Sequence, residues 1–269
     1  MRKIGIRYYD SALTRENFKQ MRDGGIDATE LCLVHNPMEL DFREVRKYAY
    51  EAGIEIWSTH LPFKHEFSIV QKTAEERKTA LELNAELIRR ATDIGVDKFI
   101  IHPSFIVREE DNREECINYS KEALNSLAYL ASSNGAQIAV ENMIPLCLGR
   151  TTDELLDIVS VNDKLRICFD VNHLLIDTHE EFVRKTADKI ITCHISDYDF
   201  VMERHWFPGE GKNDWPKINA LFNEIGYKGV WMYELSPGTI NDFRSRELTV
   251  RDFYNNAQEI FAGKVPSRI

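Results

Sequence analysis

The stretch GAQIAVEN, residues 135–142, contains the pattern that decides the fold. Before it, apolar residues recur at helical spacing, at Ile117, Leu124, Leu127 and Ala131. Gly135 follows this pattern, and glycine is a common stop signal after a helix because it adopts a left-handed conformation without strain. The apolar run Gln137–Glu141 comes next and ends on a carboxylate. The stretch therefore predicts a step from helix to strand, with a polar residue at the carboxyl end of the strand.

The same step recurs along the chain. Glycine precedes three further apolar runs, at Gly53, Gly95 and Gly226. The candidate strands, which alternate with helical patterns, are Lys3–Tyr8, Ile26–Leu33, Ile54–His60, Lys98–His102, Gln137–Glu141, Arg166–Asp170, Ile190–His194 and Gly229–Glu234. These βα units in 269 residues predict an α/β fold, a (β/α)8 TIM barrel of a single domain over residues 1–269. The alternative is a doubly wound open sheet, which is disfavoured because no GxGxxG loop follows the first strand.

The composition is that of an acidic globular protein. Hydrophobic residues make up 43% and charged residues 29% of the chain, and 34 Lys and Arg against 44 Asp and Glu give a formal net charge of −10. Because such a protein repels phosphate backbones, nucleic acid is not an expected partner. No run approaches the roughly 18 apolar residues of a membrane span, and the polar N-terminus does not resemble a signal peptide, so we expect no membrane association.

The cysteines are odd in number, and no CxxC spacing occurs among Cys32, Cys116, Cys147, Cys168 and Cys193. This pattern disfavours both a disulfide framework and a four-cysteine zinc site. Free thiols in a reducing compartment, and hence a cytoplasmic location, are the expectation.

Polar residues stand at or near the carboxyl ends of the predicted strands. In the strand Gln137–Glu141, Glu141 shares a face with Ala139, whereas Ile138 and Val140 take the other face. The apolar face must pack under the helices, so the polar face points into the barrel, at the rim where TIM-barrel active sites are built. The same reasoning gathers His60, His102, Glu141, Asp170, His173, His194 and Glu234, with Glu203 and His205 in the loop after the seventh strand.

Taken singly, a histidine or an acid at a strand end is more often structural than functional. Several carboxylates converging on one pocket, however, would repel each other unless a cation were bound between them. Carboxylates and imidazoles are also the ligands of divalent metals. We therefore expect a divalent metal (Mn, Zn, Mg or Co) at this rim.

The motifs at the strand ends run in order over about the last four-fifths of the chain: STHLPF (58–63), IIHPS (100–104), VEN (140–142), FDVNH (169–173), CHISD (193–197), ERHWFPGEG (203–211) and YEL (233–235). As a series they resemble the xylose isomerase-like barrel superfamily. Two branches share them, the sugar isomerases and epimerases, and the endonuclease IV-type phosphodiesterases. The resemblance implies the TIM barrel and a metal site.

The epimerase branch implies one metal ion held by four residues, Glu141, Asp170, His194 and Glu234. It also implies that His173 contacts the substrate. A further substrate-binding glutamate of this branch corresponds to Cys147 here, which is a departure from the pattern.

The endonuclease IV branch implies up to three zinc ions on nine ligands. The matching residues are His60, His102, Glu141, Asp170, His173, His194, Glu203, His205 and Glu234, where Glu203 replaces an aspartate of that branch. Against action on DNA stand the net charge of −10 and the segments after the first two strands, which carry only Arg15 as a positive charge.

The favoured interpretation is a metal-dependent isomerase or epimerase of a sugar or sugar phosphate that holds one ion. Glu141 and Glu234 would transfer the proton through an enediolate, while His60, His102, His173, Arg204 and His205 would bind the substrate. Arg204 is expected to contact a phosphate or hydroxyl or, equally, to pair with Glu203 or Glu210. The alternatives are a multinuclear zinc phosphodiesterase and a sugar-binding protein without chemistry. The expected partner is a small carbohydrate, and a homo-oligomer is left open.

Overall fold

The structure, a computed structural model, describes residues 2–239, 241 and 244–269. Its parallel strands are β1 (Ile4–Tyr9), β2 (Ala28–Cys32), β3 (Glu55–His60), β4 (Lys98–Ile101), β5 (Gln137–Glu141), β6 (Arg166–Asp170), β7 (Ile190–His194) and β8 (Trp231–Tyr233). Each predicted strand overlaps one of these strands. The bounds of β5, β6 and β7 are as predicted, and the ends of the other strands differ by at most two residues, so that His102 and Glu234 lie just beyond β4 and β8.

The order of the strands closes the sheet into a barrel. Strands β1 to β7 lie in chain order, and β8 pairs with β1. Between β7 and β8, the backbone N–H of Ile195 donates to the carbonyl oxygen of Met232 at 2.8 Å, and Ile195 bridges to Tyr233. The (β/α)8 TIM barrel is therefore confirmed, and the doubly wound sheet is excluded.

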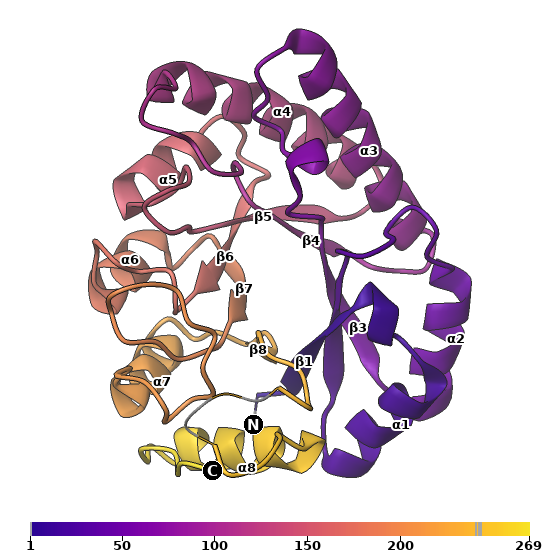
Figure 1. The fold of residues 1–269 in the computed structure, drawn as a ribbon, viewed down its shortest axis with the longest axis vertical. Helices are drawn as coiled ribbons and strands as arrows, with labels where there is room; N and C mark the ends of the chain where they lie inside the picture. The colour runs from indigo at the N-terminus through magenta and orange to yellow at the C-terminus, as the bar shows by residue number, and fades with distance from the viewer. Residues whose placement is uncertain (1, 240, 242–243) are drawn as a thin grey trace.

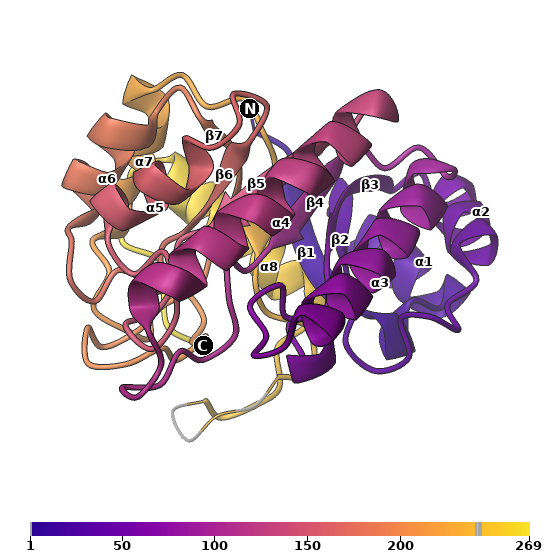
Figure 2. The same cartoon turned by 90° about the horizontal axis from the view of Figure 1, so that it is seen from above.

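The helices form a layer around the strands (Figure 1). They are α1 (Arg15–Gly24), α2 (Phe42–Ala52), α3 (Ala74–Thr92), α4 (Arg113–Ser133), α5 (Thr152–Val159), α6 (His179–Thr186), α7 (Trp215–Glu224) and α8 (Val250–Phe261), with short 3-10 turns at η1 (Asp10–Ala12) and η2 (His65–Phe67). Figure 2 shows the two long helices α3 and α4 side by side on one flank. Among the described residues, no helix is both long enough and apolar enough to cross a membrane.

The predicted glycine stops are confirmed. Gly53 ends α2 with a φ of 70°, and Gly95, Gly135 and Gly226 have φ values of 92°, 75° and 66°. Any other residue is strained in this left-handed region. These glycines let each helix turn directly into the strand that follows.

The core has two parts, as the alternation of faces predicts. The larger part, between sheet and helices, contains Ile138 and Val140, which face away from the barrel interior. Two small clusters are separate from it, one of Ile100, Ala139 and Cys168 and one of Ala28, Val230 and Met232. Ala139 shares its face with Glu141, so the barrel interior holds apolar residues below the charged residues of the rim.

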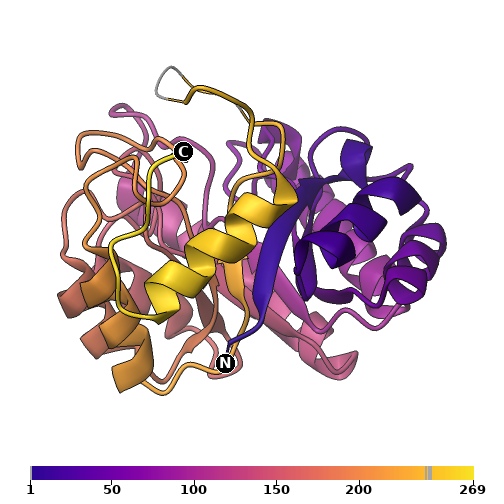
Figure 3. The same ribbon diagram turned by 90° about the horizontal axis from the view of Figure 1, so that it is seen from below.

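The loop after β7 is organised around one buried carboxylate, that of Asp197. Its Oδ1 accepts hydrogen bonds from the backbone N–H groups of Tyr198 and Asn213 at 2.9 and 3.1 Å. Its Oδ2 accepts hydrogen bonds from the backbone N–H of Gly209 at 2.8 Å and from the indole N–H of Trp215 at 2.9 Å. Figure 3 shows the C-terminal segment returning beside this loop, where Arg268 Nε donates to the Gly209 carbonyl at 3.0 Å. The loop that carries Glu203 and His205 is thus anchored at both ends.

Replacing Asp197 by Asn should lower the free energy of unfolding by about 2–4 kcal/mol. An amide NH2 would face two N–H donors, so two hydrogen bonds are lost and those donors stay buried without acceptors. Urea denaturation measures the change. The control is Asp153→Asn, since the Asp153 side chain is 79% exposed and pairs with Lys185 at the surface; it should change stability by at most about 0.5 kcal/mol. Equal effects of the two substitutions would contradict the role of Asp197.

Candidate metal centre and active site

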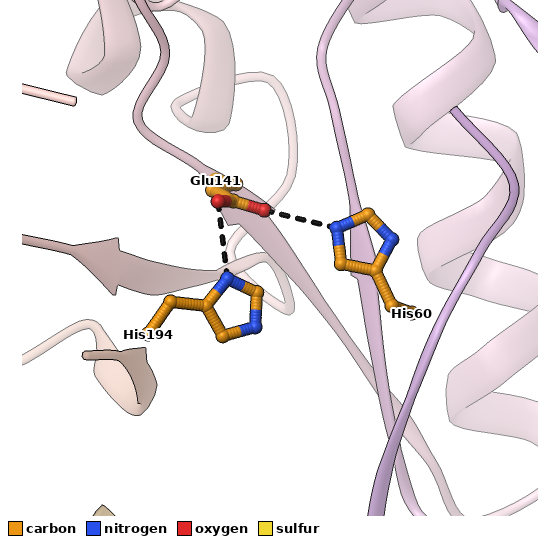
Figure 4. A group of neighbouring side chains, drawn as sticks. All are labelled: His60, Glu141 and His194. Carbon is orange, nitrogen blue, oxygen red and sulfur yellow. Dashed lines mark hydrogen bonds and ion pairs between the residues drawn. The ribbon is translucent and has the colours of Figure 1, made fainter. Parts of the chain in front are cut away.

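Glu141, at the end of β5, is the hub of the rim. Its Oε1 lies 3.1 Å from His194 Nδ1, and its Oε2 lies 3.2 Å from His60 Nε2 (Figure 4). His102 Nε2 lies 3.4 Å from the same Oε2. Burial raises the pKa of Glu141, but the positive charge of His194 and the hydrogen bonds from the three histidines outweigh it and hold the pKa well below its usual value. Glu141 is therefore a buried, ionised carboxylate.

Four residues from the ends of β5 to β8 converge: Glu141, Asp170, His194 and Glu234. One ligand atom of each lies within 4.8 Å of the others, and all four side chains are buried. Asp170 Oδ2 and Glu234 Oε2 are buried without a hydrogen-bond partner. Burial and the neighbouring Glu234 raise the pKa of Asp170 well above its usual value. Because a cation would satisfy both orphaned oxygens, this set of three carboxylates and one imidazole fits a divalent metal.

A second group lies above the first and consists of His173, Glu203 and His205. Glu203 Oε1 lies 3.2 Å from His173 Nε2 and 2.6 Å from His205 Nε2. His205 Nδ1 lies 3.3 Å from Glu234 Oε2, which links the two groups. Burial lowers the pKa values of both histidines, but the surrounding carboxylates raise them to about 9. His205 also has a φ of 47°, an unfavourable conformation for a non-glycine residue and one typical of functional loops.

The hydrogen bonds of Asn142, in the VEN motif, join the ends of two strands. Its Nδ2 donates to the carbonyl oxygen of Asp170 at 2.9 Å, and its Oδ1 accepts the N–H of Asp170 at 2.8 Å. Its own carbonyl oxygen lies 2.9 Å from His173 Nδ1. Asn142, which follows Glu141 in the chain, thus fixes the positions of Asp170 and His173 relative to Glu141.

The structure brings together all nine of the carboxylates and histidines that the sequence predicts at the rim. Arg204 is placed differently. Its Nε and Nη2 atoms lie 2.9 and 2.8 Å from Asp199 Oδ2, and its Cζ lies 5.3 Å from the centre of the Trp206 ring. The alternative of a pairing with Glu203 or Glu210 is wrong, because the Arg204 guanidinium pairs with Asp199, Glu203 contacts His173 and His205, and Glu210 pairs with Arg244 at 2.5 Å.

Two charged residues of the site were missed by the sequence analysis. Arg7 of β1 forms a buried ion pair with Glu234 and donates to Tyr9 Oη at 3.1 Å. Glu30 of β2 is buried and lies 3.0 Å from His194 Nε2. Burial raises the pKa of Glu234, but Arg7 and the histidines outweigh it and hold the pKa well below its usual value. The signal was present in both strands, since a charged residue inside an apolar run must be paired when it is buried.

Six charged or histidine residues of the site line a cavity of about 290 Å³, namely Arg7, His102, His173, Glu203, His205 and Glu234. The rest of its lining is Tyr9, Phe63, Ser104, Phe105, Ile106, Met143, Ile144 and Cys147. Burial raises the pKa of Cys147 to about 12, so the thiol that stands in place of a glutamate is neutral. A pocket of this size, with polar groups converging on one side, is suited to a small polar molecule.

A family model described as the xylose isomerase-like TIM barrel matches residues 18–251. The chain belongs to this family. The expected resemblance is therefore confirmed. In TIM barrels, active sites form at the carboxyl ends of the strands, which is where the polar residues of this chain are gathered.

Several individual proteins are similar to this chain. A probable endonuclease 4 of Acholeplasma laidlawii is 26% identical over 231 residues, which are 83% of this chain and 66% of that protein. The chain spans just under two thirds of the length of the curated relatives that it matches. A D-psicose 3-epimerase structure in the presence of D-fructose is similar with a TM-score of 0.79 and 16% identity, over 96% of this chain and 99% of that one. The IOLI protein with a bound zinc atom gives a TM-score of 0.74 and 17% identity, over 95% of each chain. At these identities the two structures establish a shared fold.

Replacing Arg7 by Met should lower the free energy of unfolding of the metal-free protein by about 3–5 kcal/mol, because it leaves the buried Glu234 without its cation. Urea denaturation in the presence of a chelator measures the loss. Arg204→Met is the matched control, since the Arg204 side chain is one-third exposed. Its ion pair with Asp199 should contribute at most about 1 kcal/mol to the free energy of unfolding. If both variants lost the same stability, the ion pair of Arg7 and Glu234 would not have the role assigned to it.

Proposed function

We propose that this protein is a divalent-metal-dependent isomerase or epimerase of a small sugar. The observation that carries the proposal is the convergence of Glu141, Asp170, His194 and Glu234, with two orphaned carboxylate oxygens, beside a cavity of about 290 Å³. The similarity of the fold to D-psicose 3-epimerase supports it. The zinc atom in the IOLI structure supports the choice of a divalent ion.

The metal would be held by these four residues and would supply a Lewis acid for the carbonyl and the neighbouring hydroxyl of the sugar. Glu141 and Glu234 come from strands three positions apart in the barrel, and both are ionised because their pKa values are held low. One carboxylate takes the proton from the carbon beside the carbonyl, and the electron pair of that C–H bond forms the enediolate. To shift the carbonyl, the carboxylic acid formed in this step returns its proton to the neighbouring carbon. To invert the carbon, the other glutamate takes up a proton from water and delivers it to the opposite face of that carbon, while the first glutamate releases its proton to water.

Other residues of the cavity position the sugar. His102 and His173 lie in the cavity wall and would bind substrate hydroxyls, while Phe63, Met143 and Ile144 keep water from the reacting carbon. Among the described residues lining the cavity, the guanidinium is that of Arg7, and Glu234 already neutralises it. Because this pairing occupies the guanidinium of the described cavity lining, it favours an uncharged sugar over a sugar phosphate.

Proton exchange tests the mechanism. In D2O, the metal-loaded protein should incorporate deuterium at the carbon beside the carbonyl of its ketose substrate, as followed by proton NMR across a panel of ketohexoses and ketopentoses. Glu141→Gln should slow exchange by at least about 100-fold, since general-base catalysis contributes roughly that factor. Glu55→Gln, at the exposed start of β3, should leave the rate unchanged. Turnover without incorporation would contradict the enediolate, and sugar binding without turnover or exchange would indicate a binding protein.

A second candidate is a multinuclear zinc hydrolase. The group of His173, Glu203 and His205, and the group of His60, Glu141 and His194, each have ligand atoms close enough to hold a further ion. The match to a probable endonuclease 4 supports this alternative, whereas the net charge of −10 disfavours a nucleic-acid substrate.

Metal content separates the two candidates. After reconstitution with zinc and removal of the excess, elemental analysis should find about one ion per chain for the isomerase. The reason is that, among the residues the structure describes, the buried carboxylate oxygens without a hydrogen bond belong to the four-residue set. Asp170→Asn should remove that ion, and Glu203→Gln should retain it. About three ions per chain, with loss of one or more in Glu203→Gln, would favour the hydrolase.

A further inference from the structure

Glu30 is a fully buried carboxylate in the middle of β2, and its side chain lies against the inner edge of His194. Its Oε1 lies 3.0 Å from His194 Nε2, and its Oε2 accepts a hydrogen bond from Ser58 Oγ at 2.7 Å. The side chains of Glu30 and His194 are both 0% exposed. Glu30 is not one of the residues lining the cavity of about 290 Å³.

The opposite edge of the His194 ring faces the candidate metal ligands. Its Nδ1 lies 3.1 Å from Glu141 Oε1 and 3.7 Å from Glu234 Oε1. The imidazole is therefore held between Glu30 on one side and the carboxylates of the four-residue set on the other. Of its two nitrogens, only Nδ1 is directed at the place where an ion would lie.

The position of Glu30 depends on an irregularity in the sheet. The register between β2 and β3 shifts between Thr29 and Glu30, so that Thr29 lies opposite Ile56 but Glu30 lies opposite Ser58. The extra residue in β3 is Trp57. Bulges of this kind often re-aim side chains near functional sites. Here the shift places the Ser58 hydroxyl where it can hold one oxygen of Glu30 and leave the other for His194.

A metal needs a ring nitrogen with a free lone pair. A neutral imidazole has one such nitrogen and one N–H, and the partner of the N–H decides which nitrogen is which. We propose that Glu30 is a positioning residue that keeps the proton on His194 Nε2 and thereby presents Nδ1 to the metal. The inference rests on the metal centre of the proposed function, and it adds a residue that lies outside the four-residue set and the lining of the cavity.

A simpler alternative is that Glu30 and His194 form a buried ion pair that only stabilises the barrel. The two possibilities differ in what the loss of Glu30 affects. A purely structural pair affects the unfolding free energy of the metal-free protein and leaves the affinity of the folded protein for metal unchanged. A positioning residue affects the metal affinity as well, because the ring loses its preferred tautomer and orientation.

The test is a zinc titration of wild-type protein and of Glu30→Gln, in competition with a chelating dye. The variant should bind zinc about 10- to 100-fold more weakly at the tightest site, the effect typical of the loss of a hydrogen-bond partner to a metal-bound histidine. Glu55→Gln, the same substitution at the first residue of β3, should bind zinc as the wild type does. In zinc-loaded wild-type protein labelled with 15N-histidine, NMR should show His194 protonated at Nε2, with a proton resonance shifted far downfield that moves upfield in Glu30→Gln.

The outcomes separate the inference from the function beneath it. Wild-type zinc binding with an unchanged affinity in folded Glu30→Gln would overturn the role of Glu30 and leave the metal centre standing. A wild type that binds no zinc would overturn the metal centre itself. If Glu30→Gln does not fold, Ser58→Ala replaces it, since it removes the other hydrogen bond to Glu30. That variant should weaken zinc binding about threefold or more, and an unchanged affinity would again overturn the inference.

Discussion

The repulsion among three carboxylates inside the barrel is the constraint on which the rest of the site depends. Glu141, Asp170 and Glu234 come from β5, β6 and the end of β8, and they are almost wholly removed from water. Burial alone disfavours each charge, and the presence of the others disfavours it further. Asp170 shows the unrelieved part of this repulsion, because its pKa is raised well above the usual value and one of its oxygens accepts no hydrogen bond. A divalent cation at this point would remove a free-energy penalty that the protein alone leaves in place.

The surrounding strands supply partial compensation, and every strand of the barrel takes part. Arg7 of β1 pairs with Glu234, Glu30 of β2 pairs with His194, and His60 of β3 and His102 after β4 approach Glu141. The barrel makes this possible because its strands end together at one rim. The fold and the electrostatics of the site are therefore one problem. An open sheet of the same strands would not bring residues of β1 beside residues of β8.

The sequence predicts the barrel and the nine rim residues because both depend on short-range patterns. Alternation along a strand decides which side chains face inward, and the end of a strand decides which of them reach the rim. Arg7 and Glu30 lie within their strands, so reasoning from strand ends does not reach them. The partner of Arg204 depends on how the loop after β7 folds back, and Asp197, which organises that loop, forms its bonds with residues up to 18 positions away. Such contacts have no periodic signal in the sequence.

The loop after β7 carries the residues that distinguish the two candidate functions, the isomerase with one metal ion and the multinuclear zinc hydrolase. The four-residue set serves either chemistry, whereas Glu203 and His205 extend it toward a second ion. In the metal-free geometry, Glu203 Oε1 is already engaged by both His173 and His205. A second ion would have to displace these hydrogen bonds, while the first ion would meet two oxygens that accept no hydrogen bond. Because the Cys147 thiol in the cavity lining is neutral, it is less suited to binding a further cation than a carboxylate at this position would be. The balance of satisfied and orphaned groups therefore favours a single ion and a small uncharged substrate above it.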